Sequence, residues 1–93
     1  MSADQPEDQA FVYEMGRRVR LHRLYRGLTQ EQLGEQARLS RNFISILETG
    51  RHGIDVRALR RIARALDVPL PSLVSEPGEG SFPWTPAQDG APR

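Results

Sequence analysis

Two neighbouring side chains, Arg41 and Asn42, have the chemistry needed to read nucleic-acid bases. A guanidinium group can donate paired hydrogen bonds to O6 and N7 of guanine, and a carboxamide can pair with N6 and N7 of adenine. Ser45 follows one helical turn later with a hydroxyl group, whereas Ile46 can only touch a thymine methyl group. We predict that these four residues contact DNA bases; for Ile46, an orientation along the protein surface is the alternative.

Base contacts require a helix that presents these residues, and residues 29–50 have the pattern of two short helices joined by a three-residue turn. Thr29 and Ser40 can each cap a helix, because a hydroxyl oxygen can accept a hydrogen bond from a backbone N–H group two or three residues later. The apolar residues recur three or four positions apart in both helices: Leu33, Ala37, Ile44 and Leu47. This spacing predicts a helix-turn-helix with its recognition helix at about residues 41–49.

The positive charge of the chain is concentrated in its middle. The formal net charge is only +1, but residues 17–64 contain twelve arginines and four acidic residues, a net charge of +8. Residues 1–16 carry −4 and residues 65–93 carry −3. A basic centre between acidic ends is expected of a small DNA-binding core. All thirteen basic residues are arginines, which a GC-rich genome would explain before any binding role does.

The length of 93 residues, with 38% hydrophobic and 27% charged residues, indicates one small globular domain. Apolar residues at helical spacing predict a first helix over about residues 9–26 and a fourth over residues 56–66, with Asp55 as its N-cap. A short fifth helix is expected to end near Ser75. We therefore expect an N-terminal tail at residues 1–8, the folded domain at 9–75 and a Pro/Gly-rich C-terminal tail at 76–93.

The chain from about Met15 to Val74 resembles the Cro/C1-type helix-turn-helix family, also called XRE-like. The matching residues are Met15, Gly16, Val19, Arg20, Arg23, Gly27, Leu28, Thr29, Gln30, Gln32, Leu33, Ser40, Ile44, Ser45, Glu48, Gly50, Leu59, Ile62, Ala63, Ala65 and Leu66. The resemblance implies an all-α fold, a compact five-helix bundle like the lambda repressor DNA-binding domain, with flexible termini. It also implies a transcriptional regulator that binds a pseudo-palindromic operator in double-stranded DNA as a homodimer.

The resemblance also implies roles for residues outside the recognition helix. Contacts to the DNA backbone are expected from Gln30, Arg38, Arg51, His52 and Arg57. Arg23 and Glu48 stand at positions that commonly form an ion pair between the first helix and the recognition helix, with two unrelated surface charges as the alternative.

Three residues depart from the family pattern, and one of them is Ile46, which stands where the family often has a polar side chain that faces the groove. Arg38 occupies a turn position where the family usually has Gly, so a left-handed backbone there would store about 1 kcal/mol of strain. Gly34 replaces the more usual Ala, which permits a close approach at a cost of about 1 kcal/mol in helix propensity.

The dimer surface implied by the resemblance is the fifth helix and the adjoining loop, which here means Leu70, Leu73 and Val74. Phe82 and Trp84 in the C-terminal tail either reinforce this surface, fold back on their own subunit or stay mobile. The alternative function is a protein-interaction module of the same fold, which binds a toxin or a polymerase subunit. Ile46 and the two tail aromatics favour that alternative, whereas the basic core argues against it.

The remaining arginines are expected to lie mostly on solvated helix faces: Arg17, Arg18 and Arg20 on the first helix, and Arg60, Arg61 and Arg64 on the fourth.

Other function classes lack the necessary residues. There are no cysteines, and two separated histidines make no metal site. No serine has a partner set for nucleophilic catalysis, so we expect neither an enzyme nor a cofactor nor a small-molecule ligand. No apolar run is long enough to cross a membrane, and the acidic N-terminus does not resemble a signal peptide. The expected location is the cytoplasm, in association with the nucleoid.

Overall fold

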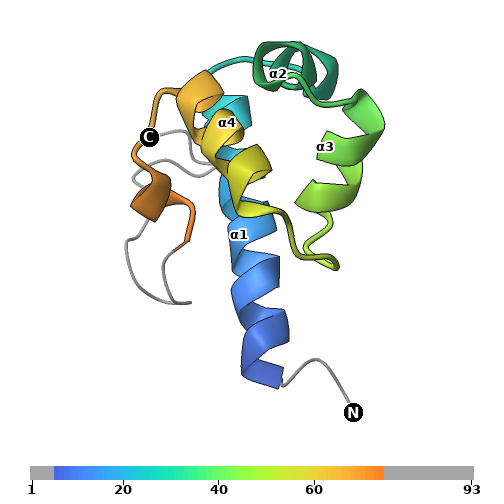
Figure 1. Cartoon of the computed structure of the whole chain (residues 1–93), viewed down its shortest axis with the longest axis vertical. Coiled ribbons are helices and arrows are strands. Elements are labelled where there is room, and N and C mark those ends of the chain that lie inside the picture. The colour runs from blue at the N-terminus through green and yellow to red at the C-terminus, as the bar shows by residue number, and fades with distance from the viewer. Residues whose placement is uncertain (1–5, 75–93) are drawn as a thin grey trace, which may run out of the picture.

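The computed structural model describes residues 6–74 as a bundle of helices, and this part of the chain contains no strand (Figure 1). Its elements are α1 (Pro6–Tyr25), α2 (Gln30–Ala37), α3 (Arg41–Glu48), α4 (Val56–Leu66) and the 3₁₀ helix η1 (Leu70–Ser72). The all-helical fold is as expected, but the count of five helices is not confirmed, because the segment after α4 forms only a single 3₁₀ turn. Two prolines, Pro69 and Pro71, flank and interrupt that segment, and proline provides no N–H group for a regular α-helix.

Helix α1 begins at Pro6, three residues before the expected start at Gln9. Proline is favourable in the first turn because its missing N–H group would have no partner there, and Glu7 and Asp8 complement the positive end of the helix dipole. The helix ends at Tyr25, and Gly27 follows in a left-handed conformation with φ of 72°. Residues 6–8 therefore extend α1, whereas residues 1–5 and 75–93 lie outside the described part.

The predicted N-caps are all present. The Thr29 hydroxyl accepts a hydrogen bond from the Gln32 N–H group at 3.0 Å, and the Gln32 side chain accepts one from the Thr29 N–H group at 2.8 Å, which completes a capping box. Ser40 caps α3 by accepting from the Phe43 N–H group at 2.9 Å. Asp55 caps α4 through the Arg57 N–H group. The starts of these three helices were thus predictable from local sequence.

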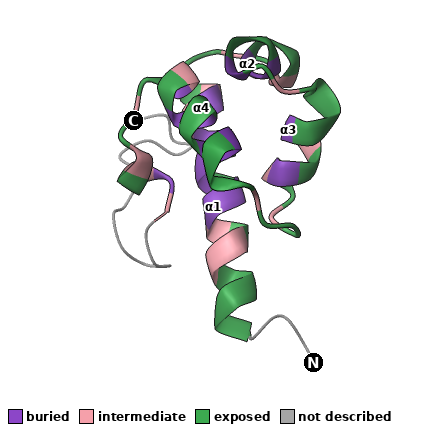
Figure 2. Cartoon of the chain, in the orientation of Figure 1, coloured by how far each residue is buried: buried purple, intermediate pink, exposed green. Residues whose placement is uncertain are grey.

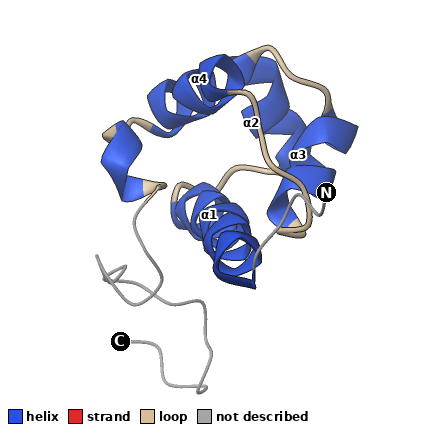
Figure 3. Ribbon diagram, turned by 60° about the horizontal axis from the view of Figure 1, so that its bottom comes forward, coloured by secondary structure: helices blue, strands red, loops and turns tan. Residues whose placement is uncertain are grey.

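The core lies where the helices face one another, while the first turns of α1 project beyond it and are exposed (Figure 2). Helix α2 packs against α3 and α4, and α1 packs against α3. In Figure 3, which looks nearly along α1, the other three helices are arranged around one side of it. The fully buried large side chains are Val19, Leu33, Ile44, Ile62, Leu66 and Leu73. They come from all four helices and from the residue after η1, so one core fixes the whole bundle.

Gly34 provides the predicted close approach within the helix-turn-helix. A Cβ atom added there would lie 2.5 Å from the Leu39 carbonyl oxygen in the turn. Gly16 plays the same part on α1, where an added Cβ atom would collide with the Leu47 carbonyl oxygen of α3. The two glycines therefore set how closely α3 lies against α2 and α1.

Candidate nucleic-acid interface

One face of α3 is buried and the other is open to solvent. Ile44 and Leu47 are 0% and 3% exposed and hold the helix on the core. On the outward side Arg41, Asn42 and Ile46 are exposed, and Ser45 is half-buried. Because residues four apart lie next to one another on a helix, these side chains form a continuous surface. We call these four residues the α3 outward face.

The exposure of Ile46 shows that this residue faces away from the core. Its side chain is 42% exposed, so it does not belong to the core. Phe43 on the same helix is 36% exposed. The α3 outward face therefore combines polar groups with accessible apolar surface, and this agrees with either of the two functions considered from the sequence.

The end of α3 is tied to α1 by Arg23 and Glu48. Arg23 Nε lies 2.6 Å from Glu48 Oε2 and Arg23 Nη2 lies 2.9 Å from Glu48 Oε1, a two-point contact between side chains that are 8% and 4% exposed. Arg23 Nη1 also donates to the Leu28 carbonyl oxygen at 2.8 Å. Three of the guanidinium donors are thus used within the protein, which fits a positioning role rather than a contact with a ligand.

Gln30 joins the same network from the first residue of α2. Its Nε2 donates to Glu48 Oε1 at 3.1 Å, so Glu48 accepts hydrogen bonds from both α1 and α2. Gln30 is itself half-buried. A side chain held in this way has lost its rotational freedom before any ligand arrives, which lowers the entropy cost of using it to bind a phosphate.

The loop after α3 and the start of α4 carry three of the expected backbone contacts. Arg51 and His52 are exposed in the loop. Arg57 is 85% exposed and lies 2.9 Å from Asp55 Oδ2. The side-chain hydrogen bond from Arg57 lowers the pKa of Asp55 to about 2, and the same bond raises the pKa of Arg57. A phosphate that binds the Arg57 guanidinium would therefore compete with Asp55, the N-cap residue of α4.

Arg38, which stands at a turn position where the family usually has Gly, has a left-handed backbone with φ of 61° and ψ of 45°. Its N–H group caps the end of α2 by donating to the Glu35 carbonyl oxygen at 3.3 Å. The side chain is exposed and lies on the α4 side of the turn, in a pocket with three arginines of that helix.

The structure changes the expected dimer surface. Leu73 is 0% exposed and belongs to the core of its own chain, so its side chain offers no surface to a partner. Leu70 and Val74 are half-buried and pack against that core. The resemblance had implied a place for Leu73 on the dimer surface, but it does not tell whether an apolar residue is covered by its own chain or by a second one. Phe82 and Trp84 lie outside the described residues.

Arg18, expected on a solvated face, is buried instead, whereas Arg61 is exposed as expected but also makes a structural contact. The Arg18 side chain is 4% exposed and pairs with Glu14 at 3.0 Å on α1. Arg17 also pairs with Glu14, but Arg17 and Arg20 are exposed. Arg61 Nε donates to the Ala37 carbonyl oxygen at 2.9 Å and so satisfies an acceptor at the end of α2. The sequence did not predict either contact. It indicated only that the last carbonyl groups of a helix generally need hydrogen-bond donors from elsewhere.

Within residues 6–74, no group of three or more His, Asp or Glu side chains could hold a metal ion, and no helix has the length and apolar character of a membrane span. The pKa of His22 is lowered by its burial and by the nearby charge of Arg18, which favours a neutral imidazole.

A family model described as a helix-turn-helix domain matches residues 14–76 of this sequence. The chain belongs to the Cro/C1-type helix-turn-helix family. It is 36% identical over 62 residues to the immunity repressor protein of Bacillus phage phi105, covering 67% of this chain and 43% of the repressor. The chain thus matches less than half the length of that relative. A hypothetical transcription factor of Neisseria meningitidis is 30% identical over 79 residues, 85% of this chain and 74% of the relative.

Solved structures of family members have the same arrangement of helices. The crystal structure of the Neisseria factor superposes with a TM-score of 0.71 over 85% of this chain and 91% of the other. The restriction-modification controller protein C.AhdI from Aeromonas hydrophila is 29% identical, with a TM-score of 0.65 over 67% and 94% of the two chains. The P22 c2 repressor, solved with a synthetic operator, is 25% identical, with a TM-score of 0.63 over 72% and 96%.

Proposed function

We propose that this protein is a transcriptional regulator that binds a specific sequence of double-stranded DNA as a homodimer. The observation that carries the proposal is the α3 outward face, where exposed Arg41 and Asn42 stand on a helix whose other side is fixed in the core. A rigid helix of this kind can enter the major groove without rearranging the protein. Membership of a family of transcriptional regulators supports the same function.

Base reading is assigned to the α3 outward face. Arg41 at the start of the helix is suited to guanine, and Asn42 is suited to adenine. Ser45 provides a hydroxyl group one turn later, and Ile46 provides a contact to a thymine methyl group. The sequence preference would then come from a few polar contacts and one apolar contact.

Backbone contacts flank this surface. Gln30, already held by Glu48, lies at the start of α2, where the helix N-terminus favours a phosphate. Arg51, His52 and Arg57 lie beyond the other end of α3 and are exposed. Arg38 is retained as a backbone contact of the turn. Such contacts fix the register of the recognition helix but carry no sequence information.

Dimerisation would place two recognition helices about 34 Å apart, in successive major grooves of a pseudo-palindromic operator. With Leu73 in the core, the proposed surface is reduced to Leu70 and Val74. The P22 c2 repressor, a related chain, was solved in complex with operator DNA, which supports an operator as the ligand here. A cytoplasmic location with the nucleoid follows from such a ligand.

Selection of binding sites from random duplex DNA tests the proposal. We expect an enriched pseudo-palindrome, and an affinity that falls steeply with salt, with a slope in log K of about −0.9 for each phosphate neutralised. Recovery of no preferred sequence would refute sequence-specific binding.

A protein-interaction module remains the second candidate, because Ile46 and Phe43 leave apolar surface exposed on α3. The same salt titration separates the two functions. An apolar protein interface would keep its affinity as salt rises, whereas a DNA complex would lose counterion-release energy. Ile46→Asp would abolish binding to an apolar partner whatever the salt concentration.

A further inference from the structure

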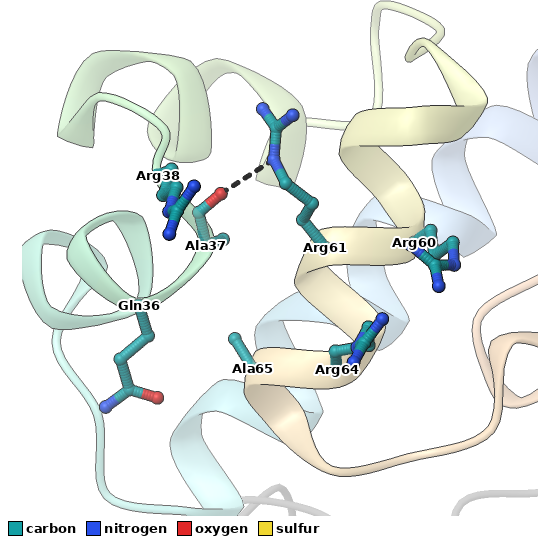
Figure 4. A pocket seen from close by; sticks show the side chains of 7 residues that line it. All are labelled: Gln36, Ala37, Arg38, Arg60, Arg61, Arg64 and Ala65. Carbon is teal, nitrogen blue, oxygen red and sulfur yellow. Dashed lines mark hydrogen bonds between the residues drawn. The ribbon is translucent and has the colours of Figure 1, made fainter.

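A pocket of about 540 Å³ lies between the end of α2 and the middle of α4, and arginines dominate its lining (Figure 4). Arg38 comes from the turn after α2, on one side of the pocket, and Arg60 and Arg64 come from α4 on the other. Arg61 reaches across to the Ala37 carbonyl oxygen. The volume lies within the range of about 300–1,000 Å³ found for small-molecule sites, but the lining is cationic rather than apolar.

No acidic side chain lines this pocket. Within residues 6–74, neither Arg38 nor Arg60 nor Arg64 takes part in an ion pair, whereas Arg17, Arg18, Arg23, Arg26 and Arg57 all do. Arg60 and Arg64 are four residues apart on one helix, a spacing at which like charges repel. The free protein thus holds three arginines at this pocket, none of which has an ion-pair partner in the described part.

The pocket is separate from the α3 outward face. None of Arg41, Asn42, Ser45 and Ile46 lines it, and its α4 residues lie one to two turns beyond Arg57. Arg38 is the one residue common to this pocket and to the proposed DNA contacts. The left-handed backbone at Arg38 is a strained conformation for any residue except glycine, and it brings a fourth cation to the pocket.

We propose that this pocket is a binding site for phosphate groups. Guanidinium forks donate paired hydrogen bonds to phosphate oxygens, and a phosphate or diphosphate has enough oxygens to accept from more than one fork. Arg60 and Arg64 are the principal groups that bind the phosphate, and Arg38 adds positive charge from the turn. Arg61 links α4 to the end of α2 through its hydrogen bond to Ala37. The phosphate belongs either to a small phosphorylated molecule or to the DNA backbone beyond the recognition helix.

The test uses inorganic pyrophosphate as the probe and heteronuclear NMR of the full chain at constant ionic strength. We expect saturable shifts of the arginine Nε–Hε signals and of the amides of residues 36–38 and 60–65. Arg60→Gln with Arg64→Gln should weaken binding at least about tenfold, and the matched Lys pair should lose part of the affinity, because it keeps charge but not the fork. Arg17→Gln with Arg20→Gln changes two exposed arginines on α1 outside the pocket and is the control for the same loss of two positive charges.

Two further measurements identify the source of the phosphate. The ligand is a small phosphorylated molecule if two results are obtained together. Pyrophosphate still binds when the protein is in complex with its selected DNA, and the Arg60→Gln, Arg64→Gln variant binds that DNA with normal affinity. The phosphate is that of the DNA backbone if pyrophosphate competes with DNA and the Arg60→Gln, Arg64→Gln variant binds both pyrophosphate and DNA more weakly. Shifts that never saturate, or an equal loss of affinity in the Arg17→Gln, Arg20→Gln variant, would overturn the proposal. The titration with pyrophosphate uses no DNA, so its result does not depend on the proposed regulator function.

Discussion

Glu48, the last residue of α3, accepts a two-point ion pair from Arg23 of α1, with the shorter contact at 2.6 Å. The same carboxylate accepts a hydrogen bond from Gln30 of α2 at 3.1 Å. One buried carboxylate therefore links α3 to both helices that precede it. The position of the α3 outward face relative to the start of α2 depends on this carboxylate.

Removal of one partner of this ion pair should be strongly destabilising. Arg23→Ala leaves the Glu48 carboxylate buried without its counter-charge, and we expect the free energy of unfolding to fall by about 3–5 kcal/mol. Urea denaturation measures the change. Arg17→Ala is the matched control, because it breaks an ion pair whose arginine is 43% exposed and should cost less than about 1 kcal/mol. Similar losses in the two variants would contradict the role assigned to Glu48.

Gly34→Ala should destabilise the protein although alanine is the better helix former. Helix propensity alone favours the alanine by about 1 kcal/mol, but the new Cβ atom would lie 2.5 Å from the Leu39 carbonyl oxygen, which is backbone and cannot easily move. Thermal unfolding should show a lower melting temperature. Gly53→Ala is the control, since an added Cβ atom meets nothing within 4 Å there and the variant should unfold like the wild type.

Leu73→Ala should lower stability through the core rather than through dimer contacts. Its side chain is 0% exposed, and a Leu→Ala cavity in a core costs about 2–5 kcal/mol. The loss should be the same at low and high protein concentration. Leu70→Glu, at a half-buried position, should instead shift sedimentation toward the monomer, and an unchanged dimer would remove Leu70 from the proposed surface.

The proposed readers and backbone contacts should differ in what their loss does to sequence preference. Arg41→Ala should cost about 1–3 kcal/mol and relax the preference at one base pair, whereas Arg57→Ala should weaken all sequences alike and reduce the salt slope by about 1. Repeated site selection with each variant measures this. An unchanged selected site for Arg41→Ala would show that Arg41 does not read a base.

Stability should fall in mild acid because of His22. Its pKa is lowered below 6.5 in the folded protein by burial and by Arg18, so the folded state binds fewer protons than the unfolded state. Above pH 6.5 the imidazole is neutral in both states and causes no loss of stability. As the pH falls below that value, protonation of the unfolded state lowers the free energy of unfolding. Unfolding free energies measured from pH 8 to pH 5 should fall less in His22→Gln than in the wild type; parallel curves would contradict this assignment.

Features set by neighbouring residues were predictable from the sequence, and those set by distant packing were not. Thr29, Ser40 and Asp55 cap their helices as expected, because a cap involves residues only two or three positions apart. The resemblance correctly implied the pairing of Arg23 with Glu48, which lie 25 residues apart. By contrast, the burial of Leu73 depends on which helices cover it, and no local pattern contains that information.

The candidate site followed the same division. The outward position of Arg41 and Asn42 was predictable from helical periodicity once the apolar face was known. The contact from Arg61 to the Ala37 carbonyl oxygen was not, since it joins two helices whose relative position is set by the core. The gathering of arginines between α2 and α4 was missed for the same reason, and the sequence alone favoured a solvated helix face.

The exposure of Arg41, Asn42 and Ile46 has a consequence for how this protein can change over evolutionary time. Substitutions at exposed positions usually alter the free energy of unfolding by no more than about 0.5 kcal/mol. The bundle underneath, held by Ile44, Leu47 and the Glu48 network, does not depend on which side chains are displayed. Under the proposed function, new target sequences are therefore accessible to descendants of this chain by single substitutions that leave folding intact.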